Sequence, residues 1–394
     1  MRSGTGVAAG RWRPIGLAAL IAVVVGLGGG SVAPAQAPVT ARASTLPARL
    51  SDAAFWKLSA SLSEPGGTFR SDNLVSNEHT FQYVLPALVR QTRPGGVYLG
   101  VAPDQNFTYI AAIRPAMAFI VDIRRGNLLE LLMYKALFEL SADRAEFISR
   151  LFSKARPPGL SPSSTVVDLF TAFDRVPTSE ALYRENVRAI HRQLTAVHGF
   201  TLSEEDWDQL ESIYFAFFWD GPSIRYSMGS GFGRWGGRGF NGFPSYEDLA
   251  MQTDWEGTFR SYLANDEYYQ AVRSLEQRNL IVPVVGNFAG PKALRAVGRY
   301  IREHDSTVSA FYVSNVEQYL FQDGLFPAFA ENVATLPVDD HSAFIRSVSS
   351  RFGYLGLYLG PDGRASALDP IAAFVRDFHA GRIRTYYDVN SRSK

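Results

Sequence analysis

The chain has 394 residues, of which 46% are hydrophobic and 20% charged, and its formal net charge is +1. This length and composition indicate a globular protein with one large or two ordinary domains and exclude a disordered chain. The near-neutral charge gives no general basis for binding nucleic acid, and the absence of cysteine excludes disulfides and thiolate chemistry. We therefore expect a small-molecule ligand and no nucleic-acid partner.

Residues 1–43 have the pattern of a signal peptide or N-terminal anchor with a linker. Three arginines precede an apolar run over 15–28, and cleavage after Ala35 or Ala43 satisfies the small-x-small rule. The run is shorter than the about 20 residues that a membrane-spanning helix needs. We expect an exported protein, periplasmic or secreted, with membrane anchoring as the alternative.

The stretch from Gly95 to Arg125 predicts a strand, a turn, a short helix and a second strand. The first strand, 97–99, stops at Gly100, and the second, 118–121, ends at Asp122. In parallel α/β sheets, ligands bind beyond the carboxyl ends of the strands, where a glycine lets them approach the backbone. A carboxylate about 20 residues later accepts ribose hydroxyls. The pattern predicts a nucleoside pocket.

The phosphate-binding part of a dinucleotide fingerprint is missing, because no further glycine follows Gly100 at the required spacing. This argues against NAD or FAD and favours S-adenosylmethionine, a nucleoside without a pyrophosphate. The predicted cofactor-binding residues are Gly100, Ala102, Asp122, Ile123 and Asn77. In the alternative interpretation this is an ordinary βαβ unit in which Asp122 caps the following helix.

Residues 63–78, SEPGGTFRSDNLVSNE, contain more hydrogen-bonding side chains than a surface turn needs. They are Arg70, Asp72, Asn73, Ser76, Asn77 and Glu78. The density predicts a binding loop at the mouth of the pocket. The alternative is a capped helix start at Ser76 or Asn77.

A second strand, turn, helix, strand pattern occupies residues 280–313, and polar residues follow its strands. These residues are Gly286, Asn287, Asn315 and Glu317. Because the carboxyl ends of parallel strands meet at one edge, we expect them in the same crevice as Asp122. The catalytic residues are unknown, with Asn287, Asn315 and Glu317 as candidates. Asn315 and Glu317 are alternatively helix-start residues.

Residues 156–276 are predicted to form a helical insertion on an α/β domain that spans 44–394. Within it, the Gly-rich stretch 221–243 contains a literal G-x-G-x-x-G, which we reject as a fingerprint because no buried strand leads into it. A flexible lid over the pocket is the interpretation preferred, and a mobile loop the alternative. After Ser342 the sequence predicts a helix, a strand over 354–359 and a terminal helix over 370–380.

Several catalytic signatures are absent. No Walker loop or G-x-S-x-G elbow occurs, and none of the six histidines forms an H-x-x-x-H or H-E-x-x-H pair. We therefore expect no metal site and find no anchor for phosphoryl transfer. A carboxylate-dependent hydrolase acting through Glu78 and Glu317 stays open as a weaker alternative.

Five stretches carry a resemblance to a known family. They are SEPGGTFRSDNLVSNE, GGVYLGVAPDQNFTYIAAIRPAMAFIVDIRR, YKALFELSADRAEFISRLF, NLIVPVVGNFAGPKALRAVGRYIR and VSAFYVSNVEQYLF. Together they resemble an uncharacterised bacterial family with a methyltransferase-like domain, over most of residues 60–350. The resemblance implies a Rossmann-like, mostly parallel α/β sheet with helices on both faces, and no particular substrate.

Three functions follow. The first is S-adenosylmethionine-dependent methyl transfer to an unknown acceptor, with Gly100 at the cofactor, Asp122 on its ribose and Asn287 or Asn315 near the acceptor. Export conflicts with it, because the methyl donor is kept inside the cell. The second is an exported, non-catalytic protein that binds a small molecule or a partner. The third is the hydrolase.

Overall fold

The structure is a computed structural model, and it describes residues 43–226, 243–352, 357 and 359–393. The described residues belong to one compact unit, Arg42–Lys394. The predicted signal peptide or anchor, residues 227–242 of the Gly-rich stretch and most of the predicted strand 354–359 lie outside the described residues.

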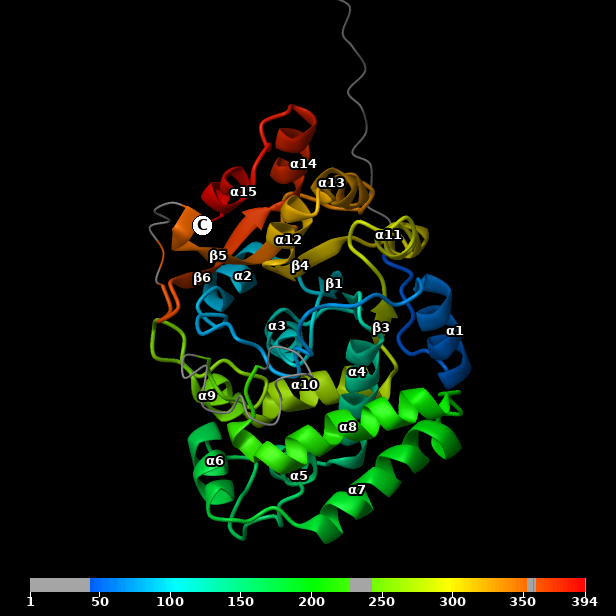
Figure 1. The fold of residues 1–394 in the computed structure, drawn as a ribbon, viewed down its shortest axis with the longest axis vertical. Helices are drawn as coiled ribbons and strands as arrows, with labels where there is room; N and C mark the ends of the chain where they lie inside the picture. The colour runs from blue at the N-terminus through cyan, green and yellow to red at the C-terminus, as the bar shows by residue number, and fades with distance from the viewer. Residues whose placement is uncertain (1–42, 227–242, 353–356, 358, 394) are drawn as a thin grey trace, which may run out of the picture. The chain divides into compact units, whose positions relative to one another are not determined.

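A six-stranded sheet forms the centre of the fold, with strand order β3-β2-β1-β4-β5-β6 (Figure 1). Its strands are β1 (Val97–Gly100), β2 (Met117–Asp122), β3 (Ile281–Val285), β4 (Val308–Ser314), β5 (Ala343–Ser349) and β6 (Arg364–Pro370). The strands β1 to β5 are parallel to one another, and β6 is antiparallel to β5. The protein is therefore an α/β protein with a mostly parallel sheet.

The predicted strands β1 to β4 form because their sequences are nearly continuous apolar runs. Every residue of β1, β2 and β3 is buried. Such runs are typical of parallel strands that are covered on both faces. Pro283 is tolerated in β3 because this strand lies at the edge of the sheet.

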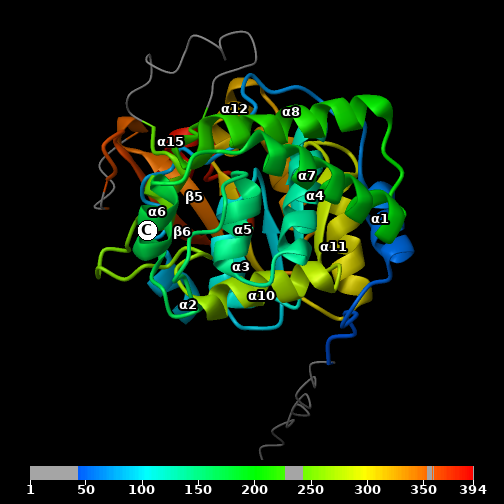
Figure 2. The same cartoon turned by 90° about the horizontal axis from the view of Figure 1, so that it is seen from below.

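Helices cover both faces of the sheet (Figures 1 and 2). On one side lie α3 (Gln105–Ile113), α4 (Arg125–Leu140) and α10 (Asp266–Gln277). On the other lie α11 (Ala293–Glu303), α13 (Phe326–Ala334) and α14 (Ile371–His379). The remaining α-helices near the sheet are α1 (Asp52–Leu62), α2 (Leu85–Gln91), α12 (Val316–Gln322) and α15 (Tyr386–Arg392).

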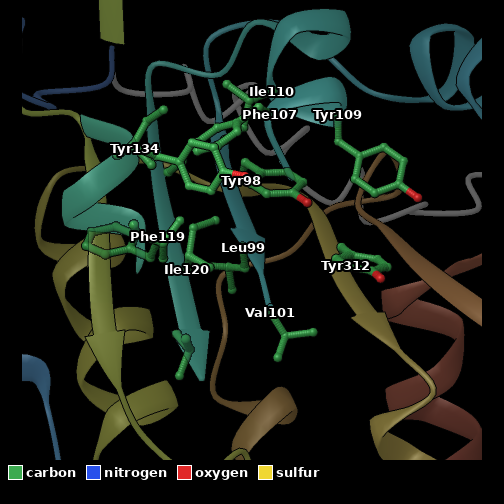
Figure 3. Packing of buried hydrophobic residues seen from close by; sticks show 14 of the residues in the cluster. Tyr98, Leu99, Val101, Phe107, Tyr109, Ile110, Phe119, Ile120, Tyr134 and Tyr312 are labelled. Atoms are coloured by element: carbon green, nitrogen blue, oxygen red, sulfur yellow. The ribbon is translucent and has the colours of Figure 1, made fainter. Parts of the chain in front are cut away.

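Aromatic side chains fill the space between the sheet and the helices α3 and α4 (Figure 3). The Phe107 and Tyr134 rings meet edge to face with centroids 5.3 Å apart, and the Tyr109 and Tyr312 rings lie 5.2 Å apart. All four side chains are at most 3% exposed. This packing fixes α3 against the ends of β1 and β4, where the candidate site lies.

The predicted helical insertion joins two strands that are neighbours in the sheet, β2 and β3. It follows α4 and α5 (Arg144–Leu151) and contributes α6 (Val166–Asp174), α7 (Glu180–Arg192), α8 (Glu204–Asp220), α9 (Tyr246–Met251) and α10. The strands β1 and β2 precede this insertion in the sequence, and β3 to β6 follow it. In the sheet, β3 and β4, which α11 connects, lie on either side of the pair β2 and β1.

The prediction of a helix after Ser342 is wrong, because Ala343–Ser349 is strand β5. The strand β6 was not predicted. Both strands carry a buried charged residue, Arg346 and Asp369, which interrupts the apolar pattern that marks a buried strand. Within the part of the chain that the structure describes, no helix is long and apolar enough to cross a membrane.

Candidate functional site

A cavity of about 870 Å³ lies at the carboxyl ends of the parallel strands. It is bordered by residues that follow β1, β2, β3 and β4, by the loop 68–78, by α12 and by residues near the ends of β5 and β6. The chain adds β2 and β3 on one side of β1 and then crosses over to add β4, β5 and β6 on the other side. Open α/β sheets bind their ligands at such a point, which lies here between β1 and β4. The cavity is the candidate site.

Most of the residues predicted from strand ends meet in this cavity. Its lining includes Asn77, Ala102, Asp122, Ile123, Gly286, Asn287 and Asn315. Of the predicted binding loop, Arg70, Asn73, Ser76 and Glu78 line it as well, whereas Asp72 does not. Gly100 and Glu317 do not line the cavity. The capped helix start expected as the alternative at Ser76 or Asn77 is not formed, since α2 begins at Leu85.

Asp122 lies at the end of β2 and is 5% exposed, but its carboxylate is already partly used. Its Oδ1 accepts hydrogen bonds from the backbone N–H and the Nε of Arg124, at 2.9 and 3.1 Å. Its Oδ2 accepts one bond from Nη2 of Arg124, at 3.0 Å. An ionised carboxylate has about four acceptor positions, so one on Oδ2 is left for a ligand. Asp122 does not occupy the N-cap position of α4, which is Arg124.

Gly100 has a different role from the predicted one. A side chain at this position would lie 1.9 Å from Oδ1 of Asn106, so the glycine makes room for Asn106 and not for a ligand. Asn106 is fully buried, accepts a bond from the Tyr98 hydroxyl and donates to the carbonyl oxygens of Val101, Ala102 and Pro103 at 2.6–2.9 Å. These bonds fix the turn that follows β1.

Three residues of the cavity lining have the left-handed backbone conformation without being glycine. They are Asn73, Ala102 and Ser314, with φ between 50° and 64°. This conformation costs a non-glycine residue about 1–2 kcal/mol, and such strain is found preferentially at functional sites. Ala102 lies two residues after β1, and Ser314 is the last residue of β4. Two of the three strained residues therefore lie at the carboxyl ends of the neighbouring strands β1 and β4.

Glu78 is a buried carboxylate in the cavity lining, 3% exposed. Its Oε1 accepts hydrogen bonds from the Tyr312 hydroxyl at 2.8 Å and from Ser314 Oγ at 2.6 Å. Its Oε2 accepts from Gln105 Nε2 at 3.1 Å. Burial, and secondarily the Glu78 charge, raise the pKa of Tyr312 well above its ordinary value, so this hydroxyl stays a donor.

Glu317 has a structural position that excludes the predicted role. It is 1% exposed and outside the cavity, and Arg346 donates to both of its oxygens at 2.5 and 3.1 Å. Arg346 also donates to Asp369 at 2.7 Å, and Arg392 pairs with Asp369 on its other side. The network ties α12 to β5, β6 and α15. The carboxylate pair Glu78 and Glu317 expected of a hydrolase is therefore not formed.

Two further buried acids are Asp104, in the turn that follows β1, and Glu130, on α4. Burial raises the pKa of Asp104 to about 7 and raises the pKa of Glu130 well above its ordinary value. Asp104 Oδ1 and both Glu130 oxygens have no hydrogen-bond partner. Neither residue lines the cavity. Among the described residues, no group of three or more His, Cys, Asp or Glu side chains could hold a metal ion.

An aromatic surface with a guanidinium group lies on the α12 side of the cavity. The Tyr319 ring meets Phe69 edge to face at 5.2 Å, and the Arg70 guanidinium lies 4.8 Å from the Tyr319 centroid. Planar rings and guanidinium groups of this kind stack on planar ligands. Among the described residues, no hydrogen-bond partner is found for the side-chain amide of Asn77 or for the Nδ2 of Asn287, whose Oδ1 accepts a bond from the Ala289 N–H. Both groups line the cavity and are available to a ligand.

Sequence reasoning missed the residues that surround Glu78. The sequence predicts Gln105 in a turn and Tyr312 within a strand, and it predicts Ser314 at the polar end of that strand without a role in the site. All three line the cavity. The available signal was Ser314 itself, because a polar residue at the carboxyl end of a buried strand faces the ligand crevice by the same rule that selected Asp122. Arg351, which follows β5, and Arg364, at the start of β6, also line the cavity.

A protein-family model with the description "Domain of unknown function (DUF7790)" matches residues 73–197 and 244–362, which is more than half of the chain. The matched segments include Glu78, Asp122 and Asn287. No curated protein matches the chain. The expected similarity to an uncharacterised family is confirmed: the chain belongs to the family of the DUF7790 domain of unknown function.

Proposed function

We propose that the protein binds an adenosyl compound in the cavity and transfers a methyl group from S-adenosylmethionine to an unknown acceptor. The observation that carries the proposal is the position of the cavity, at the carboxyl ends of β1, β2 and β4 with Asp122 in its lining. The strand order is that of the doubly wound nucleotide-binding folds, which supports a Rossmann-like interpretation of the sheet.

The lining suggests how such a ligand would lie. The free acceptor position on Asp122 Oδ2 would take one ribose hydroxyl, and the Phe69, Tyr319 and Arg70 surface would stack on the adenine. Asn287 and Asn315 remain the candidates near the acceptor. Methyl transfer depends mainly on positioning the donor and acceptor, so the proposal does not need a dedicated catalytic base.

A second function is supported by the Arg124 contacts. Because Arg124 occupies three of the acceptor positions of Asp122, only one ribose hydroxyl can bind there. A protein that binds another small molecule without catalysis would fit the same cavity. It would also agree with the predicted export, which removes the protein from the methyl donor.

The test is isothermal titration of the full chain with S-adenosylmethionine and S-adenosylhomocysteine. We expect micromolar binding, and we expect Asp122→Ala to weaken it by about 1–3 kcal/mol, the usual result of leaving a buried hydrogen-bonding group unpaired. Binding that is unchanged in Asp122→Ala would remove the ribose assignment. No binding of either compound would favour the non-catalytic function.

The control is Arg125→Gln. Arg125 follows Arg124 directly, but it pairs with Asp206 on α8 at 2.9 Å and does not line the cavity. This variant should keep the affinity of the parent protein. A loss of affinity in both variants would indicate a general disturbance at the start of α4.

A further inference from the structure

The acids in the cavity lining differ in how their charges are compensated. Asp122 is paired with Arg124, and Asp362 lies 3.9 Å from Arg364. Asp323 is exposed to solvent. Glu78 is buried, and no Lys, Arg or His of the described residues lies within ion-pair distance of it. An unpaired buried carboxylate is unfavourable unless another group supplies the opposite charge.

The surroundings of Glu78 are built to keep its carboxylate in place. Three donors hold it: the hydroxyls of Tyr312 and Ser314 on one oxygen and the amide of Gln105 on the other. Ser314 donates from a left-handed backbone conformation, with φ of 51°. These donors occupy three of the about four acceptor positions of a carboxylate, and they leave one free on Oε2.

Other buried acids of the described chain are paired with a cation, or are favoured in the neutral form. Glu317, Asp369 and Asp254 have guanidinium partners. Glu130 has no partner, but its raised pKa favours the neutral acid, and it lies outside the cavity. Glu78 alone among these five combines donors that suit an anion with a position in the cavity.

We propose that Glu78 binds a protonated amine of the ligand, an inference that deepens the proposed function and rests on it for the adenosyl probes. The amine has two chemical sources. It is either the amino group of the adenosyl compound's amino-acid part or the amine of a second molecule, the methyl acceptor. In both cases an N–H donates to the free position on Glu78 Oε2 and the positive charge compensates the carboxylate.

The first arm of the test compares S-adenosylhomocysteine with 5′-methylthioadenosine, which lacks the amino-acid part, by isothermal titration of the full chain. If the amine is that of the adenosyl compound, Glu78→Gln should lower the affinity for S-adenosylhomocysteine by at least about tenfold, as expected for the loss of a charged hydrogen bond. The affinity for 5′-methylthioadenosine should not change.

The second arm uses phenethylamine and its neutral analogue phenethyl alcohol, with and without S-adenosylhomocysteine present. Aromatic probes suit a cavity lined by Phe69, Phe288 and Tyr319. If the amine is that of a second molecule, the parent protein should bind phenethylamine at least about tenfold more tightly than phenethyl alcohol. Glu78→Gln should abolish this preference while both adenosyl compounds bind as before.

The matched control is Asp323→Asn, which removes an exposed carboxylate from the same cavity lining. It should leave every affinity unchanged. The comparison of phenethylamine with phenethyl alcohol on the parent protein needs no variant, and equal affinities would overturn a second-molecule amine. If Glu78→Gln does not fold, Glu78→Ala, which also removes the charge, replaces it in both arms with the same expected results.

The outcomes separate this inference from the proposed function. If neither adenosyl compound binds, the proposed function fails, and the phenethylamine preference and its loss in Glu78→Gln alone decide the inference. If the adenosyl compounds bind but no affinity depends on Glu78 and the amine has no advantage over the alcohol, the inference is overturned and the proposed function stands.

Discussion

Two buried glutamates near the end of β4 show opposite solutions to the same electrostatic problem. Glu317 is bound on both oxygens by Arg346, in a network that includes Asp369 and Arg392. Glu78 is held by neutral donors only and lines the cavity. The ion-paired glutamate serves the fold, whereas the unpaired one has binding capacity left for a ligand.

The largest effect should come from breaking the ion-paired side. Arg346→Met leaves Glu317 buried without its partner, and we expect a loss of about 3–5 kcal/mol in the free energy of unfolding. Urea denaturation of the two proteins measures it. Glu78→Gln keeps a hydrogen-bonding side chain of the same shape and should lose only about 1 kcal/mol.

The double variant Arg346→Met/Glu317→Leu serves as the control for Arg346→Met. It removes the unpaired charge together with its partner, so part of the lost stability should return. If Arg346→Met were no more destabilising than Glu78→Gln, the contrast between a structural and a ligand-binding carboxylate would be lost.

The buried charges of the Glu317 network also explain why the sequence predicted only part of the fold. The strands β1 to β4 are apolar throughout or nearly so, and they were predicted close to their observed limits. In β5 and β6 the buried Arg346 and Asp369 interrupt that pattern. Their charges are compensated by residues far apart in the sequence, and no local pattern records such a pairing.

The candidate site was predictable to the extent that it depends on strand ends. Parallel strands end at one edge of the sheet, so Asp122, Asn287 and Asn315 were expected together, and all three line the cavity. Which carboxylates are free depends on side-chain contacts. The sequence did not indicate that Arg124 donates hydrogen bonds to the Asp122 carboxylate, or that Arg346 binds Glu317 outside the cavity.

A third kind of buried acid sharpens the comparison through its pH dependence. Burial raises the pKa of Asp104 from 3.8 to about 7. Between these values Asp104 holds a proton in the folded protein that it has released in the unfolded chain, so its contribution to stability is greatest below about pH 4 and falls as the pH rises to about 7. Asp104 lowers the free energy of unfolding by at most about 1.4 kcal/mol for each pH unit in this range. Glu130, whose pKa is also raised by burial, contributes a pH dependence of the same sign.

Asp104→Asn should remove the Asp104 part of this slope, because an amide does not titrate. Thermal or urea denaturation from pH 4 to pH 8 measures it for both proteins. We expect the variant to be more stable than the parent at pH 8, by up to about 4 kcal/mol, and the difference to shrink toward pH 4. A parallel pH dependence in both proteins would show that Asp104 is ionised in the folded state.

The smallest effect concerns the strained turn on the cavity side. Ala102 has φ of 64°, a conformation that costs alanine about 1 kcal/mol and glycine almost nothing. Glycine gains flexibility in the unfolded chain, which offsets part of this, so Ala102→Gly should stabilise the protein by roughly 0.5 kcal/mol. Ala111→Gly, a buried change within α3, is the control and should destabilise it by about 1 kcal/mol or more. Opposite signs in urea denaturation would show that the turn after β1 holds strain which the neighbouring helix lacks, whereas equal losses would mean that the Ala102 methyl group contributes more by packing than its backbone costs.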